Sequence, residues 1–171
     1  GGEFAAEGTI SRALLDDFLR EPYFRKKPPK STGRELFNLS FIERSLENLR
    51  AEGTGLPSPA GTERTLLRLT AITVAMSIKG ELREGEQALI LAAGGGVHNA
   101  LLMADLRECL EDLSVNASLG TAEDAGIDSD FLEAEAFAWL AWCRVNGVRP
   151  QLSSVTGAKE DSVPGALYLG R

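Results

Sequence analysis

The feature that most constrains the fold is a short apolar run that ends in three consecutive glycines. Residues 89–93 read Leu-Ile-Leu-Ala-Ala and are followed by Gly94, Gly95 and Gly96. A run of this kind predicts a buried strand. A helix is expected from about Asn99 to residue 110, and a second short strand near residues 114–118. A strand, a helix and a strand in this order predict a right-handed βαβ unit with parallel strands, so we expect an α/β fold.

The first fifty residues are expected to be mainly helical. Apolar residues recur at helical spacing over residues 10–18, with Thr9 as the N-cap and Pro22 as the stop. After a proline-rich loop, residues 32–35 fit the capping-box pattern and predict a second helical segment, which the amphipathic stretch 41–50 continues. Residues 51–61 contain three glycines and two prolines, which predicts a flexible connection.

The rest of the chain predicts two further helices and a closing strand. Residues 62–79 are rich in Leu, Ile, Val and Thr but too long for one strand, so they predict a largely buried helix. Another helix is expected to open at residues 130–133 and to end at Gly147. Residues 136–143 carry no charge, so this helix is expected to be packed on most sides, with Trp139 and Trp142 in the core. A last short strand is expected at residues 166–169.

Charge and the scarcity of metal ligands argue against several classes of function. The 171-residue chain has a formal net charge of -7, which argues against binding to nucleic acid or an anionic membrane. The single histidine, His98, and two separated cysteines, Cys109 and Cys143, predict no zinc site and no other metal site. Both cysteines are expected to be reduced and buried. Neither a signal peptide nor a membrane-spanning run is visible, so we expect a cytoplasmic protein.

The glycine turn is the first candidate binding site. Three residues without side chains, placed between a strand and a helix start, leave free N–H groups where a nucleotide phosphate or ribose can approach. The spacing is not the Rossmann fingerprint, because Asn99 stands where that pattern needs Gly or Ala, and no P-loop sequence occurs. Two interpretations stay open: a nucleotide-facing turn, or a tight turn whose following helix is capped by Asn99.

Two further segments are candidate site elements. Glu133 enters the first turn of a nearly all-apolar helix, so it is either a cap paired with Asp130 or a carboxylate that positions a sugar hydroxyl or a water at a cleft. The loop after Pro29 is either a proline-stiffened connection with a helix cap or the rim of a cleft. Its candidate residues are Lys30, Ser31, Thr32, Gly33 and Arg34. Residues 154–158 form a fourth candidate loop.

Four motifs in this order and spacing resemble one enzyme family. PPKSTGRELFN, GGGVHNALLM, EAEAFAWLAW and SVTGA are similar to the C-terminal half of the anhydro-N-acetylmuramic acid kinases. The resemblance implies the C-terminal lobe of an actin-like ATPase (ribonuclease H-like) fold, a mixed sheet with flanking helices. It also implies hydrolysis of the 1,6-anhydro ring and phosphorylation of the 6-hydroxyl of the amino sugar, with ATP and Mg²⁺, in peptidoglycan recycling.

The resemblance implies roles for the candidate residues. The glycines of the turn and Asn99 would face the nucleotide, and residues 30–34 would border the cleft between two lobes. Glu133 would assist the aspartate that activates water. That aspartate belongs to a DTGPGN-like segment, which is absent from this sequence, as is the GTSxDG phosphate loop. The stretches after Asn38 and around residues 149–151 also depart from the family pattern.

These gaps shape the expected domain organisation. We expect one C-terminal kinase lobe over residues 1–171, with a helical segment over about 9–50, the connection 51–61 and a nucleotide-facing part over about 62–169. Without the N-terminal lobe the chain is expected to be inactive, and the family likeness suggests a homodimer. The alternative is a non-catalytic nucleotide- or partner-binding module derived from such a lobe.

Overall fold

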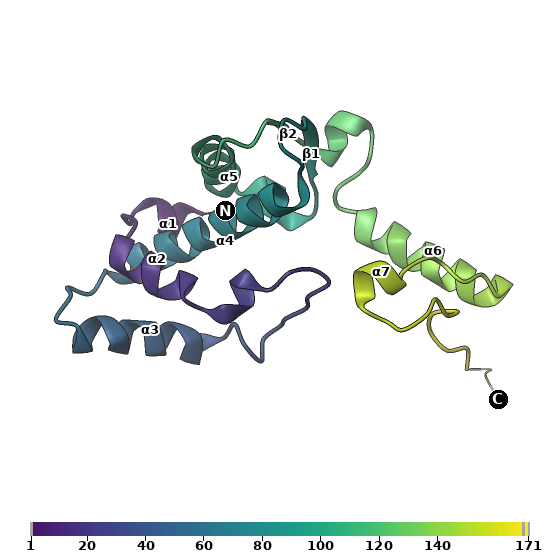
Figure 1. Cartoon of the computed structure of the whole chain (residues 1–171), viewed down its shortest axis with the longest axis horizontal. Coiled ribbons are helices and arrows are strands. Elements are labelled where there is room, and N and C mark those ends of the chain that lie inside the picture. The colour runs from purple at the N-terminus through teal and green to yellow at the C-terminus, as the bar shows by residue number, and fades with distance from the viewer. Residues whose placement is uncertain (1, 169, 171) are drawn as a thin grey trace.

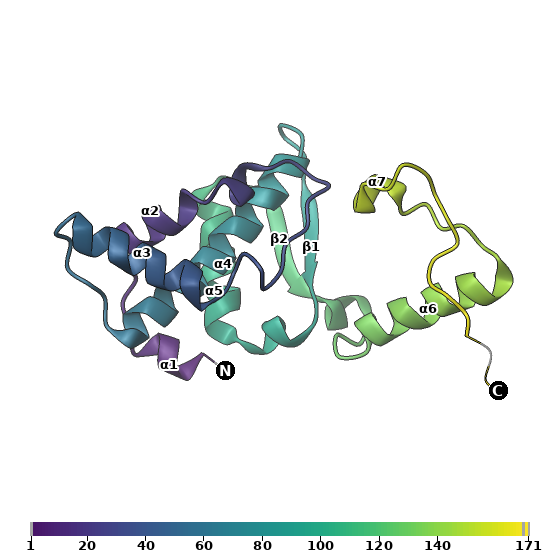
Figure 2. The same cartoon turned by 90° about the horizontal axis from the view of Figure 1, so that it is seen from below.

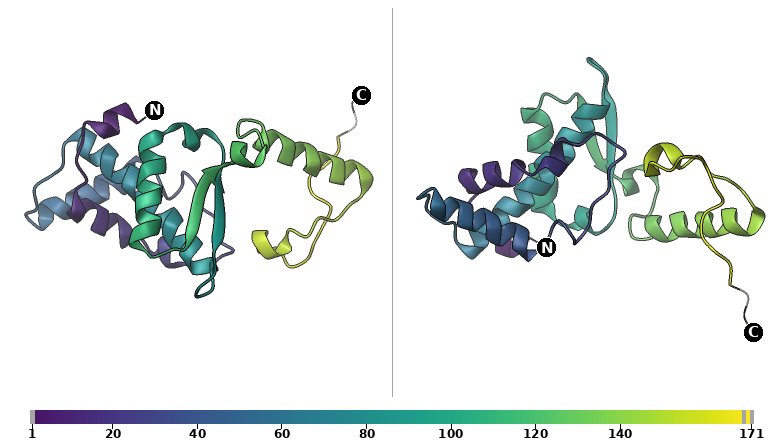
Figure 3. Two further views of the ribbon diagram at one scale, coloured as in Figure 1. Left: turned by 90° about the horizontal axis from the view of Figure 1, so that it is seen from above. Right: turned by 60° about the horizontal axis from the view of Figure 1, so that its bottom comes forward.

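The chain forms a helical body from which its C-terminal part extends (Figure 1). The computed structural model describes residues 2–168 and Gly170. α6 and α7 lie beyond β1, at the end of the molecule far from α3 (Figures 2 and 3). In chain order, the α-helices are α1 (Glu3–Ala6), α2 (Arg12–Leu19), α3 (Leu39–Ala51), α4 (Pro59–Glu81), α5 (Ala100–Asp112), α6 (Leu132–Asn146) and α7 (Ser153–Thr156). The strands are β1 (Ala88–Ala92) and β2 (Ala117–Thr121), and the 3₁₀ turns are η1 (Pro22–Arg25), η2 (Gly95–His98) and η3 (Ala122–Ala125).

The βαβ unit predicted from the sequence is confirmed. β1 pairs in parallel with β2, with Leu89 opposite Ser118 and Leu91 opposite Gly120, and α5 makes the crossover. The second strand begins at residue 117 rather than 114, so its predicted position is wrong by three residues. The cause is the turn after α5, where Ser114 takes a positive φ of 54° and its amide donates to a carbonyl of the helix. The chain can enter the sheet only after that turn.

The central helix is α4, which packs against α1, α2 and α5. Its start is fixed by Ser58, whose Oγ accepts from the Gly61 amide at 3.0 Å, and by a proline in the first turn. The predicted helix over 62–79 is therefore confirmed. It is less buried than expected, because Val74 and Met76 are 41% and 42% exposed.

Two clusters of buried side chains share α4. The first joins α2, α3 and α4, and includes a stacked ring pair, Phe18 and Phe41, whose centroids are 4.9 Å apart. The second joins two alanines of α4 to two leucines of α5, and Cys109 is buried there. Burial raises the pKa of the Cys109 thiol, which keeps it protonated and unreactive. Both cysteines are free and buried, as the sequence predicted.

Two predicted helix starts are wrong. Ser11, and not Thr9, caps α2, because its Oγ accepts from the Leu14 amide. Residues 32–35 form a turn and do not begin a helix. The helix begins after Asn38, whose Oδ1 accepts from the Phe41 amide at 3.2 Å while its Nδ2 donates to carbonyls of the preceding turn. A side chain that serves both the turn and the helix outcompetes the capping box.

The C-terminal part differs most from expectation. α6 ends at Gly147 in the left-handed conformation, as predicted, but it is not packed on most sides. Cys143 is buried, whereas Trp139 and Trp142 are 48% and 55% exposed, so their assignment to the core is wrong. Residues 166–168 form no strand, and Leu169 lies outside the described residues. Within the described chain the sheet has two parallel strands and is not mixed. Among all the described residues, no helix is long and apolar enough to cross a membrane.

A buried ion-pair cluster links α4 to α5. Arg64 Nη2 lies 2.8 Å from Asp105 Oδ1, and the side chains are only 13% and 4% exposed. Arg68 Nη1 lies 3.6 Å from the same carboxylate oxygen and 2.6 Å from Glu108 Oε2, which is 62% exposed. One buried carboxylate therefore faces two largely buried guanidinium groups.

This cluster predicts very different costs for two neighbouring substitutions. Asp105→Ala leaves two guanidinium groups buried without their shared partner and should lower the free energy of unfolding by about 3–5 kcal/mol. Glu108→Ala removes an exposed partner and should cost about 1 kcal/mol or less. Urea denaturation of both variants measures the difference, and equal costs would show that the cluster is not stabilised by its buried carboxylate.

Candidate functional site

The glycine turn lies at the carboxyl end of β1, where the sequence placed it. Gly94 has φ 78° and ψ -179°, a backbone conformation open essentially to glycine alone. The next residues make the single turn η2, and Asn99 caps α5 because its Oδ1 accepts from the Leu102 amide at 3.1 Å. The predicted cap is confirmed. It does not exclude a nucleotide-facing role for the turn, since a capped helix start still presents amide groups.

Gly95 lies in open space. A Cβ added at Gly95 would meet no atom within 4 Å, and one at Gly96 would only touch Leu102 at an ordinary 3.6 Å. Packing within this chain therefore does not require these two glycines. What their lack of side chains provides is a bare stretch of backbone that a ligand can approach closely.

A second turn stands beside the first, at the carboxyl end of β2. Asp124 Oδ2 accepts from the Thr121 amide at 2.7 Å and closes a capping box around η3. Glu123 accepts from the Ser129 amide at 3.3 Å. Hydrogen bonding by Ser129 lowers the pKa of Glu123 from its usual 4.5 to about 2. This turn was not predicted from the sequence, although the Thr-x-x-Asp spacing at the end of a strand is the signal for it.

One side-chain contact joins the glycine turn to the segment that leads into α6. His98 Nε2 lies 3.3 Å from Asp130 Oδ1, and both side chains are largely exposed. Asp130 is three residues before Glu133 in the sequence. The structure thereby brings the glycine turn and the segment of Glu133, two of the three predicted site segments, to the same edge of the sheet.

The capping interpretation of Glu133 is wrong. α6 begins after Phe131, and no side chain caps its first turn. Asp130 is occupied with His98, as described above. Within residues 2–168, no hydrogen bond or ion pair engages Glu133, which is exposed in the first turn of the helix. Among the described residues its carboxylate therefore has no structural partner, and it lies at the end of the helix where the dipole favours a negative charge.

The loop after Pro29 lies apart from the other two segments. Lys30 turns back on η1, where its Nζ donates to the carbonyl of Tyr23 at 3.4 Å and lies 4.9 Å from the centre of that ring. Residues 31–34 form a mostly exposed turn. The loop approaches the fourth candidate segment, because a Cβ on Gly157 would lie 3.4 Å from Pro29 Cγ. Among the described residues, no hydrogen bond or ion pair joins residues 30–34 to the glycine turn or to Glu133.

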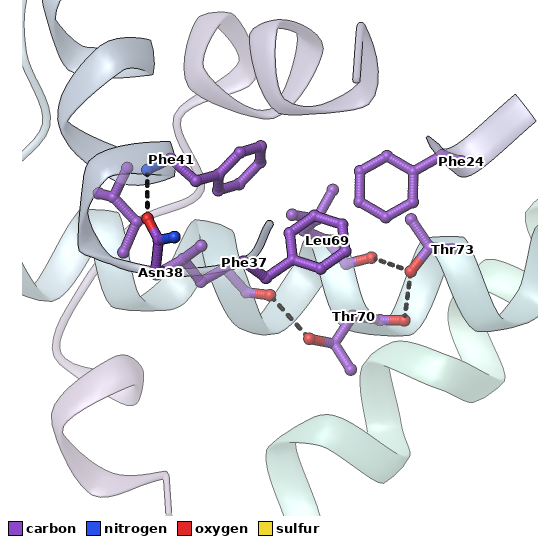
Figure 4. A pocket seen from close by; sticks show the side chains of 9 residues that line it. Phe24, Phe37, Asn38, Phe41, Leu69, Thr70 and Thr73 are labelled. Atoms are coloured by element: carbon purple, nitrogen blue, oxygen red, sulfur yellow. Dashed lines mark hydrogen bonds between the residues drawn. The ribbon is translucent and has the colours of Figure 1, made fainter. Parts of the chain in front are cut away.

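An apolar pocket of about 400 Å³ lies between α3 and α4 (Figure 4). Its two threonine hydroxyls are already used, because Thr70 donates to the Leu66 carbonyl and Thr73 to the Leu69 carbonyl. No charged side chain lines it, which makes it a poor site for a phosphate. The lining residues are Phe24, Phe37, Asn38, Phe41, Ile42, Leu66, Leu69, Thr70 and Thr73.

The described residues hold no group of three or more His, Cys, Asp or Glu side chains arranged to bind a metal ion. A divalent cation that worked at this edge of the sheet would therefore need most of its ligands from a substrate or from water. Mg²⁺ is often held in this way, through substrate phosphates and one or two carboxylates.

The geometry of the turn predicts opposite outcomes for two adjacent glycines. Gly94→Ala forces a side chain into a glycine-only conformation and should lower the free energy of unfolding by about 1–3 kcal/mol. Gly95→Ala adds a methyl group in open space and should change it by about 0.5 kcal/mol or less. Chemical denaturation of the two variants checks this, and a large loss from Gly95→Ala would mean that the turn is packed more tightly than described.

The low pKa of Glu123 predicts a pH dependence. Because the folded-state pKa of about 2 lies below the usual 4.5, the ionised carboxylate stabilises the fold above pH 4.5, and this contribution is lost as the pH falls toward 2. The Glu123→Gln variant should melt below the parent at pH 7, and the gap should close near pH 2. Glu135→Gln on α6 controls for the loss of one charge. A gap that stays constant with pH would contradict the assignment.

The sequence of this chain matches one family over nearly its whole length. A family model described as anhydro-N-acetylmuramic acid kinase matches residues 1–170. The anhydro-N-acetylmuramic acid kinase of Mannheimia succiniciproducens is 42% identical over 165 residues, which are 96% of this chain and 43% of that protein. The one from Haemophilus influenzae is 39% identical over 172 residues, covering 98% of this chain and 44% of that protein.

A third relative, from Pseudomonas syringae pv. tomato, is 41% identical over 167 residues, which cover 98% of this chain and 43% of that protein. The chain thus spans less than half the length of the curated relatives it matches. Because the family model covers nearly every residue and these relatives are 39–42% identical to the chain, the chain belongs to the anhydro-N-acetylmuramic acid kinase family.

Proposed function

We propose that this chain is the C-terminal, nucleotide-facing lobe of an ATP-dependent 1,6-anhydro-N-acetylmuramic acid kinase with an actin-like fold. The observation that carries the proposal is the bare glycine turn at the carboxyl end of β1, beside a capped helix start. In parallel α/β sheets, ligands bind outside the carboxyl ends of the strands. The family named by the comparisons uses a nucleotide, and this turn is the part of the chain best shaped to meet one.

The reaction would proceed in the cytoplasm, where ATP is available. Water adds to the anomeric carbon and opens the 1,6-anhydro ring, and the freed 6-oxygen takes the γ-phosphoryl group, giving ADP and the 6-phosphate. The amides of η2 and the start of α5 bind phosphate oxygens of ATP and orient them. Mg²⁺, carried mainly by those phosphates, would neutralise their charge.

Glu133 has a positioning role in this proposal. Its carboxylate is exposed, has no hydrogen bond within residues 2–168 and is linked through the neighbouring Asp130 to the glycine turn. It would orient the attacking water or the aspartate that removes the proton, while that aspartate belongs to the lobe that this sequence does not include. Residues 30–34 would border the cleft between the lobes. This chain alone should therefore show no sugar-dependent turnover, because loss of a general base costs about 10²–10⁴-fold.

A chimera tests both the activity and the role of Glu133. In it, this chain replaces the matched segment of the Mannheimia succiniciproducens relative. We expect ADP release that depends on the anhydro sugar. Glu133→Gln should then lower turnover by about 10²-fold or more with an unchanged melting temperature, because the change is isosteric.

The matched control is Glu135→Gln, a change two residues further along the same exposed helix. It should leave turnover within about twofold of the parent chimera. Equal turnover of the two variants would remove Glu133 from the site. A folded chimera that binds ATP but never transfers phosphate would favour the alternative, a non-catalytic nucleotide-binding module.

A further inference from the structure

One pocket of this structure has a strongly basic wall. Residues 25–34 read Arg-Lys-Lys-Pro-Pro-Lys-Ser-Thr-Gly-Arg and carry five positive charges and no negative one, although the whole chain has a net charge of -7. Three of them, Lys26, Lys27 and Lys30, line a pocket of about 320 Å³ against the C-terminal part of α4. Among the described residues that line it, the one acidic side chain is that of Glu81. Positive charge therefore prevails in this pocket, which favours an anion.

The three ammonium groups have no counter-ion among the described residues. No hydrogen bond or ion pair engages Lys26 or Lys27 there, and Glu81 pairs with neither. The Nζ of Lys30 donates to the carbonyls of Tyr23 and Phe24 at 3.4 and 3.5 Å, and no carboxylate of the described residues neutralises it. Like charges that share one pocket repel each other, and an anion placed between them relieves the repulsion.

The apolar pocket between α3 and α4 continues this basic pocket along α4. Phe24 lines both of them, and Figure 4 shows it beside Thr73, at one end of the apolar pocket. The α4 residues that line the two pockets recur every three or four positions, which places them along one face of the helix. In chain order they are Leu66, Leu69, Thr70, Thr73, Met76, Ser77, Gly80 and Glu81. We call the two pockets together the α4 groove.

The polar side chains of the apolar part are already hydrogen-bonded. The side chain of Asn38 caps α3 through its Oδ1 and donates to the preceding turn through its Nδ2. The hydroxyls of Thr70 and Thr73 donate to carbonyls of α4, and that of Ser77 donates to the Thr73 carbonyl at 2.8 Å. A hydrocarbon can therefore enter without breaking a hydrogen bond of the protein, whereas a polar ligand would bury groups of its own unpaired.

We propose that the α4 groove binds a small carboxylic acid with an apolar body, of which a medium-length fatty acid is the simplest example. Its carboxylate lies among Lys26, Lys27 and Lys30, and its hydrocarbon part lies against Phe24 and extends toward Leu69. The apolar part of the groove, at about 400 Å³, falls within the usual size of small-molecule sites. The inference goes beyond the proposed function, since it concerns neither the nucleotide nor the amino sugar.

The α4 groove is separate from the glycine turn. Ala71 and Val74 of α4 line the hollow beside Gly96, whereas Met76 lines the basic part of the groove. Val74 and Met76 are two residues apart on α4, so they point about 200° apart around the helix axis. The groove therefore opens on a different face of α4 from the candidate nucleotide site, and a ligand in it leaves the glycine turn free.

Titration calorimetry with the 171-residue chain tests the class of ligand. Octanoate should bind about tenfold more tightly than hexanoate, because two further methylene groups are buried. Octan-1-ol keeps the hydrocarbon body but lacks the charge, and it should bind at least about fivefold more weakly than octanoate. Added salt should weaken the binding of octanoate only. Equal affinities for octanoate and octan-1-ol, or no binding of octanoate up to about 5 mM, would overturn the proposal.

A pair of exposed lysines locates the site of the carboxylate. Lys26→Gln combined with Lys27→Gln should weaken octanoate binding by about fivefold or more and leave octan-1-ol unchanged. The matched control combines Arg107→Gln with Lys159→Gln, which also removes two exposed positive charges but none from the groove. It should leave octanoate binding within about twofold of the parent, because distant surface charges are screened by salt. Octanoate that binds to exposed apolar side chains elsewhere would respond equally to both pairs, and that result would overturn the proposal.

Thr73→Phe tests the apolar part of the groove. The added ring fills the space beside Phe24 and should abolish the tenfold preference for octanoate over hexanoate. The melting temperature of the variant reports whether it folds, and the lysine pair decides the question if it does not. A folded Thr73→Phe chain with the full preference would overturn the proposal.

The chimera described above tests whether the rest of the enzyme leaves the groove open. Octanoate should bind to the folded chimera with the affinity it has for the isolated chain. A folded chimera that no longer binds octanoate would overturn the proposal, in favour of a groove that another segment of the enzyme covers. A chimera that binds octanoate but lacks kinase activity would contradict the proposed function and leave the acid site standing.

Discussion

The contact on which the rest of the structure depends is the one between α4 and α5, where Asp105 meets Arg64 and Arg68. Burying three charges costs desolvation energy, so such a cluster is weak evidence for high stability. What it does is fix the register of the two helices, because a shift by one turn would leave buried charges unpaired. α5 is the crossover between β1 and β2, so the same register sets the position of the sheet and of the glycine turn.

The candidate site lies at the edge of the sheet where both strands end. Two turns with different chemistry form it, one after β1 and one after β2. The turn after β1 offers backbone amides and no side chains, whereas the turn after β2 ties its carboxylates into local hydrogen bonds. Asp124 and Glu123 are used to shape their own turn, and the low pKa of Glu123 reflects that use. The acidic side chains of the second turn are therefore held in place, and the amide-rich turn remains free to receive an anion.

The sequence predicted those features that local chemistry decides. A glycine-rich turn after an apolar run, an asparagine before a helix and a glycine after one each act within a few residues, and the βαβ unit, Asn99 and Gly147 were placed correctly. The choice between two nearby helix caps is harder to predict. Asn38 caps the helix in place of the capping-box pattern at residues 32–35, because its side chain hydrogen-bonds both to the preceding turn and to the helix. The start of β2 was misjudged because a single positive φ at Ser114 delays it.

The surroundings of α6 could not be predicted, and the reason bears on the site itself. Its sequence indicates a helix made for burial, but within the described residues only Cys143 of this helix is buried. Glu133 lies on this helix, which is tied to the body by the His98–Asp130 contact between two exposed side chains. Such a contact cannot hold a carboxylate to the fraction of an ångström that catalysis requires. If Glu133 positions water or the aspartate, further contacts to α6 must set its position.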